Sequence, residues 1–216
     1  MRSRWDWVGA ATGVVAIIVG FLGIVIGGEP TSADEGADKV VAWYADNKDQ
    51  AELSAIFAIA ATALLIFFFA YLRRVLQTAE TATGRGGMLP LLAVIGAGII
   101  GTGIAIDTTI MFAAAEAVDN KVDPTAVLAM QAIWDNDFMP IALGTLVVLW
   151  SVGLAVVLHG GLPKWLGWVA IVLGLIAPTP IGFAAVLGLL VWVLVVSILL
   201  TARSLQARSV PDAAAT

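Results

Sequence analysis

The sequence predicts an all-α protein, a polytopic membrane helix bundle with about six transmembrane helices and two short extracytoplasmic helices. The composition is the first observation: 60% of the 216 residues are hydrophobic and only 12% are charged, whereas soluble domains are about half apolar and about a quarter charged. The second is that long uncharged runs alternate with polar segments. The third is that the sign of the charge alternates from one polar segment to the next.

The predicted spans follow from the roughly 20 mostly apolar residues that a helix needs to cross a bilayer. Four uncharged runs have this length, and a fifth, 165–202, is long enough for two helices. Pro178 and Pro180 divide that run because proline breaks helical hydrogen bonding and disfavours helix at the preceding residue. The fifth span is short, so a re-entrant hairpin is the alternative. The predicted spans are 7–28, 53–72, 86–106, 138–158, 165–177 and 181–202.

The start of the chain also has features of a signal peptide, since Arg2 and Arg4 precede an apolar run. The run 7–28 is longer than a usual signal-peptide core, and Gly27-Gly28-Glu29-Pro30 is not an Ala-x-Ala cleavage site. We therefore expect the first span to be retained.

Lysine and arginine are concentrated in alternate polar segments. Eight of the 11 basic residues lie in the N-terminus, the two loops 73–87 and 159–164, and the C-terminal region, whereas 13 of the 16 acids lie in the opposite segments. The positive-inside rule then places both termini in the cytoplasm. We expect one integral membrane domain over 1–208 in a bacterial plasma membrane, followed by a disordered cytoplasmic tail over 209–216.

The two outer segments, 29–52 and 107–137, are long enough to fold. Thr31 or Ser32 can cap a helix in the first, which Asn47 and the following charges end or bend. In the second, Asp123 precedes a proline at the first position of a short helix. We expect the two helices to pack on each other over the bundle; the alternative is that both lie on the membrane surface.

Small residues at intervals of four indicate where helices can approach closely in a membrane. They recur in four of the predicted spans, and they favour packing within the chain over an oligomer interface. The motifs are Gly9/Gly13, Gly23/Gly27, Ala93/Ala97/Gly101/Ala105, Ala170/Gly174 and Ala184/Gly188.

Three acids are the candidate ion, proton or polar site. Asp107 ends the third apolar run, and Asp135 and Asp137 precede the fourth. If the third helix continues to Glu116, Asp107 lies within the outer leaflet, where a charge is costly and is a functional hypothesis by default. Such a cluster could bind a cation or relay protons, with at least one raised pKa. The alternative is that all three are solvated or cap helices.

The remaining polar residues indicate boundaries more than chemistry. Arg73 and Arg74 end the second span and are candidates for contact with lipid headgroups. His159, the only histidine, precedes Gly160 at the end of the fourth span. At a helix C-terminus its side chain interacts favourably with the helix dipole, and the glycine ends the helix. The chain has no cysteine, and we expect no catalytic residue, metal site or cofactor. The net charge of −5 argues against nucleic acid as a partner.

The segments Val41-Ala-Trp-Tyr-Ala-Asp-Asn47, Tyr71-Leu-Arg-Arg74 and Leu162-Pro-Lys-Trp-Leu-Gly-Trp168 occur in that order. In this respect the chain resembles a family of bacterial multi-pass membrane proteins, frequent in actinobacteria, known only as a domain of unknown function. The resemblance covers nearly the whole chain and implies a bundle of about six spans. It implies no activity and no catalytic residue.

The scarcity of polar residues in the spans favours a non-catalytic role. We expect an accessory or scaffold subunit of a larger membrane complex, or a lipid-binding protein, with membrane lipids and other membrane subunits or further copies of itself as partners. The alternative is a small transporter or ion- or proton-conducting protein that uses the outer acids. A lipid-modifying membrane enzyme is the second alternative.

Overall fold

The computed structural model describes residues 6–82, 84 and 87–206, and within them every regular element is a helix. The all-helical prediction is confirmed, and five helical stretches are long and apolar enough to cross a membrane, with one shorter apolar helix beside them. The elements are α1 (Asp6–Gly27), the short 3₁₀ turn η1 (Ala33–Glu35), α2 (Ala37–Ala82), α3 (Met88–Asp119), α4 (Pro124–Trp134), α5 (Met139–His159), α6 (Lys164–Ile176) and α7 (Gly182–Gln206).

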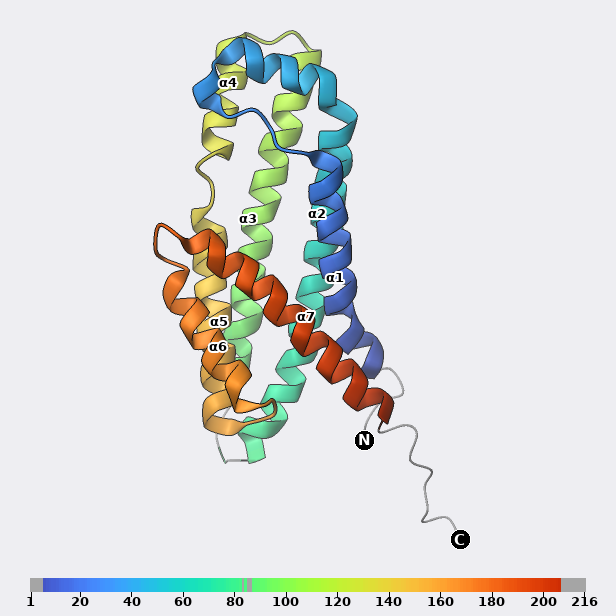
Figure 1. Ribbon diagram of the computed structural model, residues 1–216, viewed down its shortest axis with the longest axis vertical. Helices are drawn as coiled ribbons and strands as arrows, with labels where there is room; N and C mark the ends of the chain where they lie inside the picture. Colours follow the sequence, from blue (N-terminus) through green and yellow to red (C-terminus); the bar gives the residue numbers. More distant parts are fainter. Residues whose placement is uncertain (1–5, 83, 85–86, 207–216) are drawn as a thin grey trace.

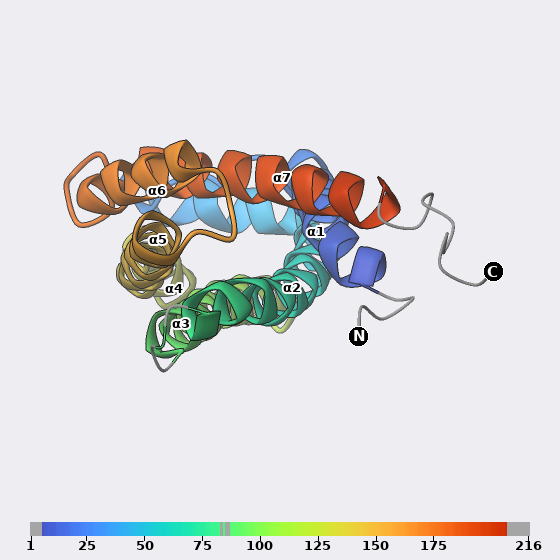
Figure 2. The same ribbon diagram turned by 90° about the horizontal axis from the view of Figure 1, so that it is seen from below.

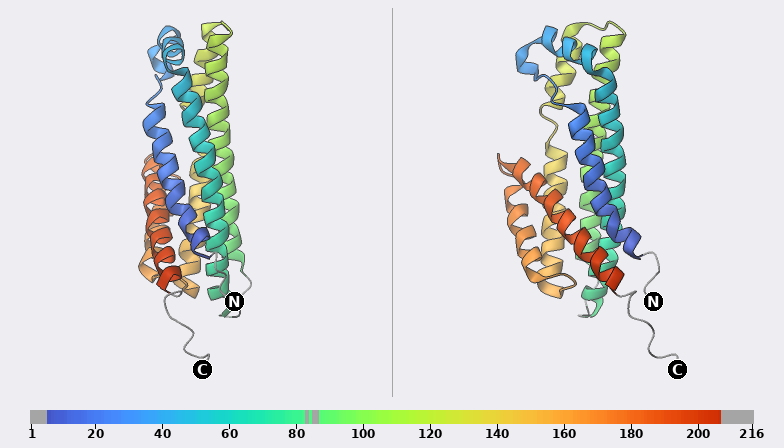
Figure 3. Two further views of the ribbon diagram at one scale, coloured as in Figure 1. Left: turned by 90° about the vertical axis from the view of Figure 1, so that its right-hand side faces the viewer. Right: turned by 45° about the vertical axis from the view of Figure 1, so that its right-hand side comes forward.

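The long helices stand side by side, and a helical cap covers one end of the bundle (Figure 1). Seen along the bundle from below, α7, α1, α2, α3, α5 and α6 follow one another around its circumference (Figure 2). The cap consists of η1, the first part of α2, the last part of α3, and α4, and we call this the cap end. The first residues of α1 and the last residues of α7 lie at the opposite end of the bundle, which we call the basic end (Figure 3).

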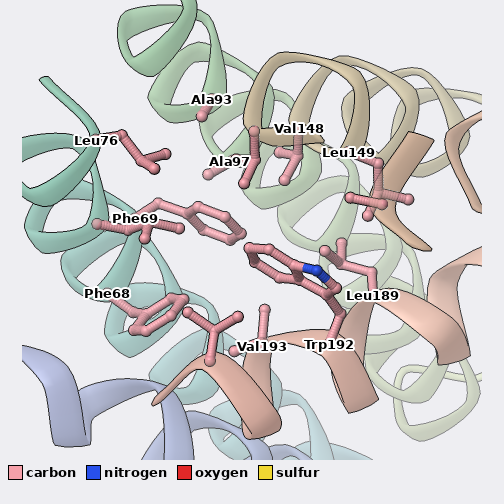
Figure 4. Close-up of a cluster of buried hydrophobic side chains, with 14 of the residues drawn as sticks. Phe68, Phe69, Leu76, Ala93, Ala97, Val148, Leu149, Leu189, Trp192 and Val193 are labelled. Atoms are coloured by element: carbon pink, nitrogen blue, oxygen red, sulfur yellow. The ribbon is translucent and has the colours of Figure 1, made fainter. Parts of the chain in front are cut away.

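Large apolar side chains fill the centre of the bundle. Phe69 of α2, Leu149 of α5 and Trp192 of α7 are each at most 2% exposed. Figure 4 shows the indole of Trp192 among side chains from α2, α3 and α5. Its Nε1–H donates a hydrogen bond of 2.9 Å to the backbone oxygen of Leu166 in α6. The tryptophan therefore occupies the centre without leaving its polar group unpaired.

Glycines allow the backbones of α3, α5 and α6 to touch. A Cβ atom added at Gly144 would lie 2.7 Å from the carbonyl oxygen of Gly96. A Cβ at Gly153 would lie 2.8 Å from the carbonyl oxygen of Gly167. Neither distance is tolerable, so these crossings require glycine. Glycines of the predicted motifs also lie at contacts within the chain. Gly188 faces α6, and the others face α2, α5 or α7. These others are Gly9, Gly13, Gly23, Gly27, Gly101 and Gly174.

The fifth and sixth predicted spans form a short hairpin. With 13 residues, α6 is about 20 Å long at 1.5 Å per residue, less than the roughly 30 Å hydrocarbon thickness. The 25-residue α7 crosses the bundle diagonally, so it descends from the same level that α6 reaches (Figure 1). The break between them falls at Pro178 and Pro180, as predicted. The Thr179 and Gly182 N–H groups donate to the carbonyls of Ile176 and Thr179.

One boundary differs from the prediction, and at another the structure shows one of the two predicted alternatives. The third helix does not end at 106 but continues to Asp119, so residues 107–119 are helical and not part of a connecting segment. At Asn47, where the sequence predicts that the first outer helix ends or bends, the helix bends (φ −123°, ψ 19°), so it is continuous with the second span in α2. In both cases the cap supplies packing partners that let a helix continue beyond its apolar run. Arg2, Arg4, Arg85, Arg208 and the predicted tail 209–216 lie outside the described residues.

Candidate functional site

The cap is built on an apolar cluster that joins three helices. Val40 and Tyr44 of α2, Met111 and Ala114 of α3, and Val127 of α4 are all at most 8% exposed and pack together. Asp123 begins α4 as predicted, because its Oδ1 accepts a hydrogen bond of 2.7 Å from the Thr125 N–H. Ser32 caps the η1 turn, and the α-helix starts only at Ala37. The two outer helices therefore pack on each other, as predicted.

A polar network runs from the buried side chains of Tyr44 and Gln131 in this cluster to the exposed carboxylate of Asp135. The Tyr44 hydroxyl donates a 2.9 Å hydrogen bond to Gln131 Oε1, and Gln131 Nε2 donates at 2.9 Å to Asp135 Oδ1. Asp135 Oδ2 accepts from the Ser32 hydroxyl at 3.1 Å and from the Ala33 N–H at 2.9 Å. One carboxylate thus links η1, α4 and the first part of α2. Asp135, predicted as an ion or proton ligand, has both oxygens engaged in holding the cap together.

Asp107 and Asp137 lie at the junction between cap and bundle, and both are half-buried. Their carboxyl groups lie close enough for their charges to repel each other. In the cap, burial raises the pKa of the Tyr44 hydroxyl, and the carboxylates of Asp107 and Asp135 raise it further. Asp137 Oδ2 is buried and has no hydrogen-bond partner in the described part of the chain. The structure therefore brings the three predicted acids to one junction, and Tyr44 of α2 lies beside them.

The acids at this junction do not form a metal centre in the described residues, where no group of three or more His, Cys, Asp or Glu side chains is arranged to hold a metal ion. Sequence reasoning did not identify Tyr44 and Gln131 as members of the site. An aromatic residue on an acidic helix and a glutamine in an apolar one were the available signals, but their pairing spans 87 positions.

A lysine joins the two long helices of the cap. Lys48 Nζ contacts Glu116 Oε1 at 3.2 Å and is hydrogen-bonded to Asp119, both on α3, and it lies 3.7 Å from Glu52 Oε1 on its own helix. The hydrogen bonds with Asp119 and Glu116 raise the pKa of Lys48. The ion pairs hold α2, just after its bend, against the end of α3.

The two candidate lipid-binding arginines lie at the basic end of α2. Arg74 lines an open pocket of about 570 Å³ together with Gln77, Thr78 and Thr81 and, at its edge, Ala82. Arg73 is half-buried, and its Nε has no hydrogen-bond acceptor among residues 6–82, 84 and 87–206. A polar hollow at this position was not predicted from the sequence.

The basic end also contains a buried contact that the sequence did not predict. His159 ends α5, and Gly160 follows with a positive φ of 87°, as expected for a helix C-terminus. Its Nε2 lies 3.9 Å from Glu80 Oε1 of α2, and the two side chains are 4% and 5% exposed. The contact joins residues far apart in the chain and lies between α2 and α5.

No family model, curated protein or solved structure matches the chain. The resemblance to the actinobacterial membrane family stays a prediction.

Proposed function

We propose that the chain is a non-catalytic subunit of a larger membrane complex and that its acidic cap is the surface that binds a partner. In this proposal the cap lies outside a bacterial plasma membrane and both termini lie in the cytoplasm. The positive-inside distribution of lysine and arginine supports that orientation.

The observation that carries the proposal is the Tyr44–Gln131–Asp135 hydrogen-bond network, which runs from the interior of the cap to its surface. It fixes the cap as a rigid body, so a partner can bind without the entropy loss of ordering two loose segments. The outer surface of this rigid body carries many exposed carboxylates, which suits a basic partner surface. These residues are Glu29, Asp34, Glu35, Asp38, Asp46, Asp49, Glu116, Asp119, Asp123 and Asp135.

The interior of the bundle supports a binding role over transport. A path for ions would need polar side chains from one end of the bundle to the other, but Phe69, Leu149 and Trp192 fill its centre. Two of the buried hydroxyls at this level, Ser151 and Ser197, donate to helix carbonyls. Their protons are thus engaged within the protein.

The test is affinity purification of the tagged full chain in a mild detergent, with quantitative mass spectrometry of the recovered proteins. We expect one membrane complex in constant stoichiometry, and we expect its recovery to fall with added salt. Replacing Asp46 and Asp49 with asparagine should release the partner, whereas Lys164→Gln, an exposed charge at the basic end, should not.

Recovery of the chain alone would overturn the proposal. Ion or proton flux in liposomes that disappears in Asp107→Asn would replace it with the transport alternative. Retention of the same partner by the cap variant would show that the complex forms through another surface and would overturn the role of the cap.

A further inference from the structure

The outward face of α2 changes from apolar to polar as the helix approaches the basic end. Ile56 and Phe67 are 56% and 66% exposed, as expected for side chains that contact lipid. Arg74, Thr78 and Thr81 continue this face and are also exposed, because residues three or four apart lie on one side of a helix. The polar pocket therefore lies where a lipid-facing surface reaches the headgroup region.

The pocket places a cation beside two hydroxyl groups that can accept hydrogen bonds from a ligand but cannot donate them. Thr78 Oγ1 donates to the Arg74 carbonyl at 2.8 Å, and Thr81 Oγ1 donates to the Gln77 carbonyl at 2.8 Å. Because each hydroxyl has one proton and that proton is engaged, its oxygen presents lone pairs to a ligand. The guanidinium of Arg74 presents N–H donors in a planar arrangement that matches a phosphate.

The described lining of the pocket contains one cationic side chain, that of Arg74. Its lining, Arg74, Gln77, Thr78, Thr81 and Ala82, contains no carboxylate. The nearest acid along the helix, Glu80, is buried and directed to His159 of α5. Arg73, on the same turn of α2, adds a second positive charge close to the pocket but is not part of its lining.

We propose that this pocket binds the headgroup of an anionic phospholipid that also carries free hydroxyls, as phosphatidylglycerol does. The phosphate accepts hydrogen bonds from Arg74, and the headgroup hydroxyls donate to the oxygens of Thr78 and Thr81. The acyl chains lie along the apolar part of the same face, beside Phe67. The lipid site is independent of the proposed function, because it lies at the end of the molecule opposite to the cap.

The test is native mass spectrometry of the full chain, purified in detergent and supplied in parallel with phosphatidylglycerol, phosphatidic acid or phosphatidylcholine. We expect one phosphatidylglycerol to be retained in preference to phosphatidic acid, and phosphatidylcholine to be retained least. Arg74→Gln should lower retention of phosphatidylglycerol about tenfold, because it removes charge-assisted hydrogen bonds. Lys164→Gln removes an exposed charge from the same end outside the pocket and should leave retention unchanged.

Two further variants separate the roles of the cation and the hydroxyls. Replacing Thr78 and Thr81 with valine should abolish the preference for phosphatidylglycerol over phosphatidic acid while both still bind. Arg74→Lys keeps the charge but not the planar donor arrangement, so intermediate retention is expected even if Arg74→Gln fails to fold.

Equal loss of lipid from Arg74→Gln and Lys164→Gln, in proteins that elute as folded on size-exclusion chromatography, would show general charge attraction and overturn the site. Equal retention of phosphatidylglycerol and phosphatidylcholine would do the same. Displacement of the lipid by soluble glycerol phosphate at similar concentration would show that the pocket takes a free phosphate ester and does not require a membrane lipid.

Discussion

The bundle and the cap are held together by different interactions, although α2 and α3 run through both. In the bundle, α3, α5 and α6 approach until their backbones touch at Gly96/Gly144 and Gly153/Gly167. In the cap, an apolar cluster surrounds the hydrogen bond between Tyr44 and Gln131, which continues to Asp135 at the surface, and ion pairs of Lys48 hold the helices together from outside.

The difference follows from the solvent that surrounds each region, which is lipid for the bundle and water for the cap. In lipid, an apolar side chain gains little by leaving the solvent, so helices associate through close packing. In water, burial of apolar surface is itself favourable, and polar side chains can determine which arrangement forms. The same helices can therefore use glycine contacts at one level and hydrogen bonds at another.

The largest expected effect is on the glycine contacts of the bundle. Gly144→Ala places a methyl group 2.7 Å from the Gly96 carbonyl oxygen, and overpacking of this kind costs about 1–3 kcal/mol or more. Gly98→Ala is the matched control because nothing lies within 4 Å of its added Cβ, and alanine in a helix is favoured by about 0.5–1 kcal/mol. Thermal unfolding in detergent should fall for the first and not for the second. Equal unfolding temperatures would show that this contact does not limit the packing.

The second effect tests the polar network of the cap. Gln131→Leu leaves the buried Tyr44 hydroxyl without its acceptor, which costs about 1–3 kcal/mol. Hydrogen exchange should increase in η1, α4 and the first part of α2, while the amides of α5 and α7 remain protected. Combining Gln131→Leu with Tyr44→Phe should cost less than the sum of the single changes, because the two residues share one hydrogen bond. Additive effects would mean that the bond contributes nothing.

The third effect concerns the ion pairs of the cap. Lys48→Met removes the contacts with Glu116, Asp119 and Glu52. Salt screens exposed charges, so hydrogen exchange at the end of α3 should increase with ionic strength in the wild type. In Lys48→Met it should be faster at low salt and nearly independent of salt. Gly144→Ala should leave this salt dependence as it is in the wild type.

The smallest effect is a pH dependence at the start of α4. The Thr125 N–H lowers the pKa of Asp123 below its usual value. A group whose folded pKa is lowered stabilises the fold above its unfolded pKa, and this contribution is lost as the pH falls through the folded value. The first turn of α4 should therefore loosen in acid, below about pH 4. Asp123→Asn keeps a good helix cap and should remove this pH dependence, as measured by hydrogen exchange corrected for the intrinsic effect of pH.

The candidate site was partly predictable because Asp107, Asp135 and Asp137 interrupt apolar runs. Their positions in the chain could not show that Asp135 is engaged by Ser32, Ala33 and Gln131. Each of those contacts depends on how the turn η1 meets α4. For the same reason, the pairing of His159 with Glu80 had no signal in the sequence.

The sequence by itself determined the class of fold, the number of apolar segments and the break at Pro178 and Pro180, because these depend on local composition and backbone chemistry. Local chemistry also sufficed for the bend at Asn47 and for the helix start at Asp123. Only the tertiary structure decided that α3 extends to Asp119, that α7 crosses diagonally beside the short α6, and that Tyr44 meets Gln131. These features depend on contacts between distant segments, and such contacts can extend or tilt a helix beyond what its own residues specify.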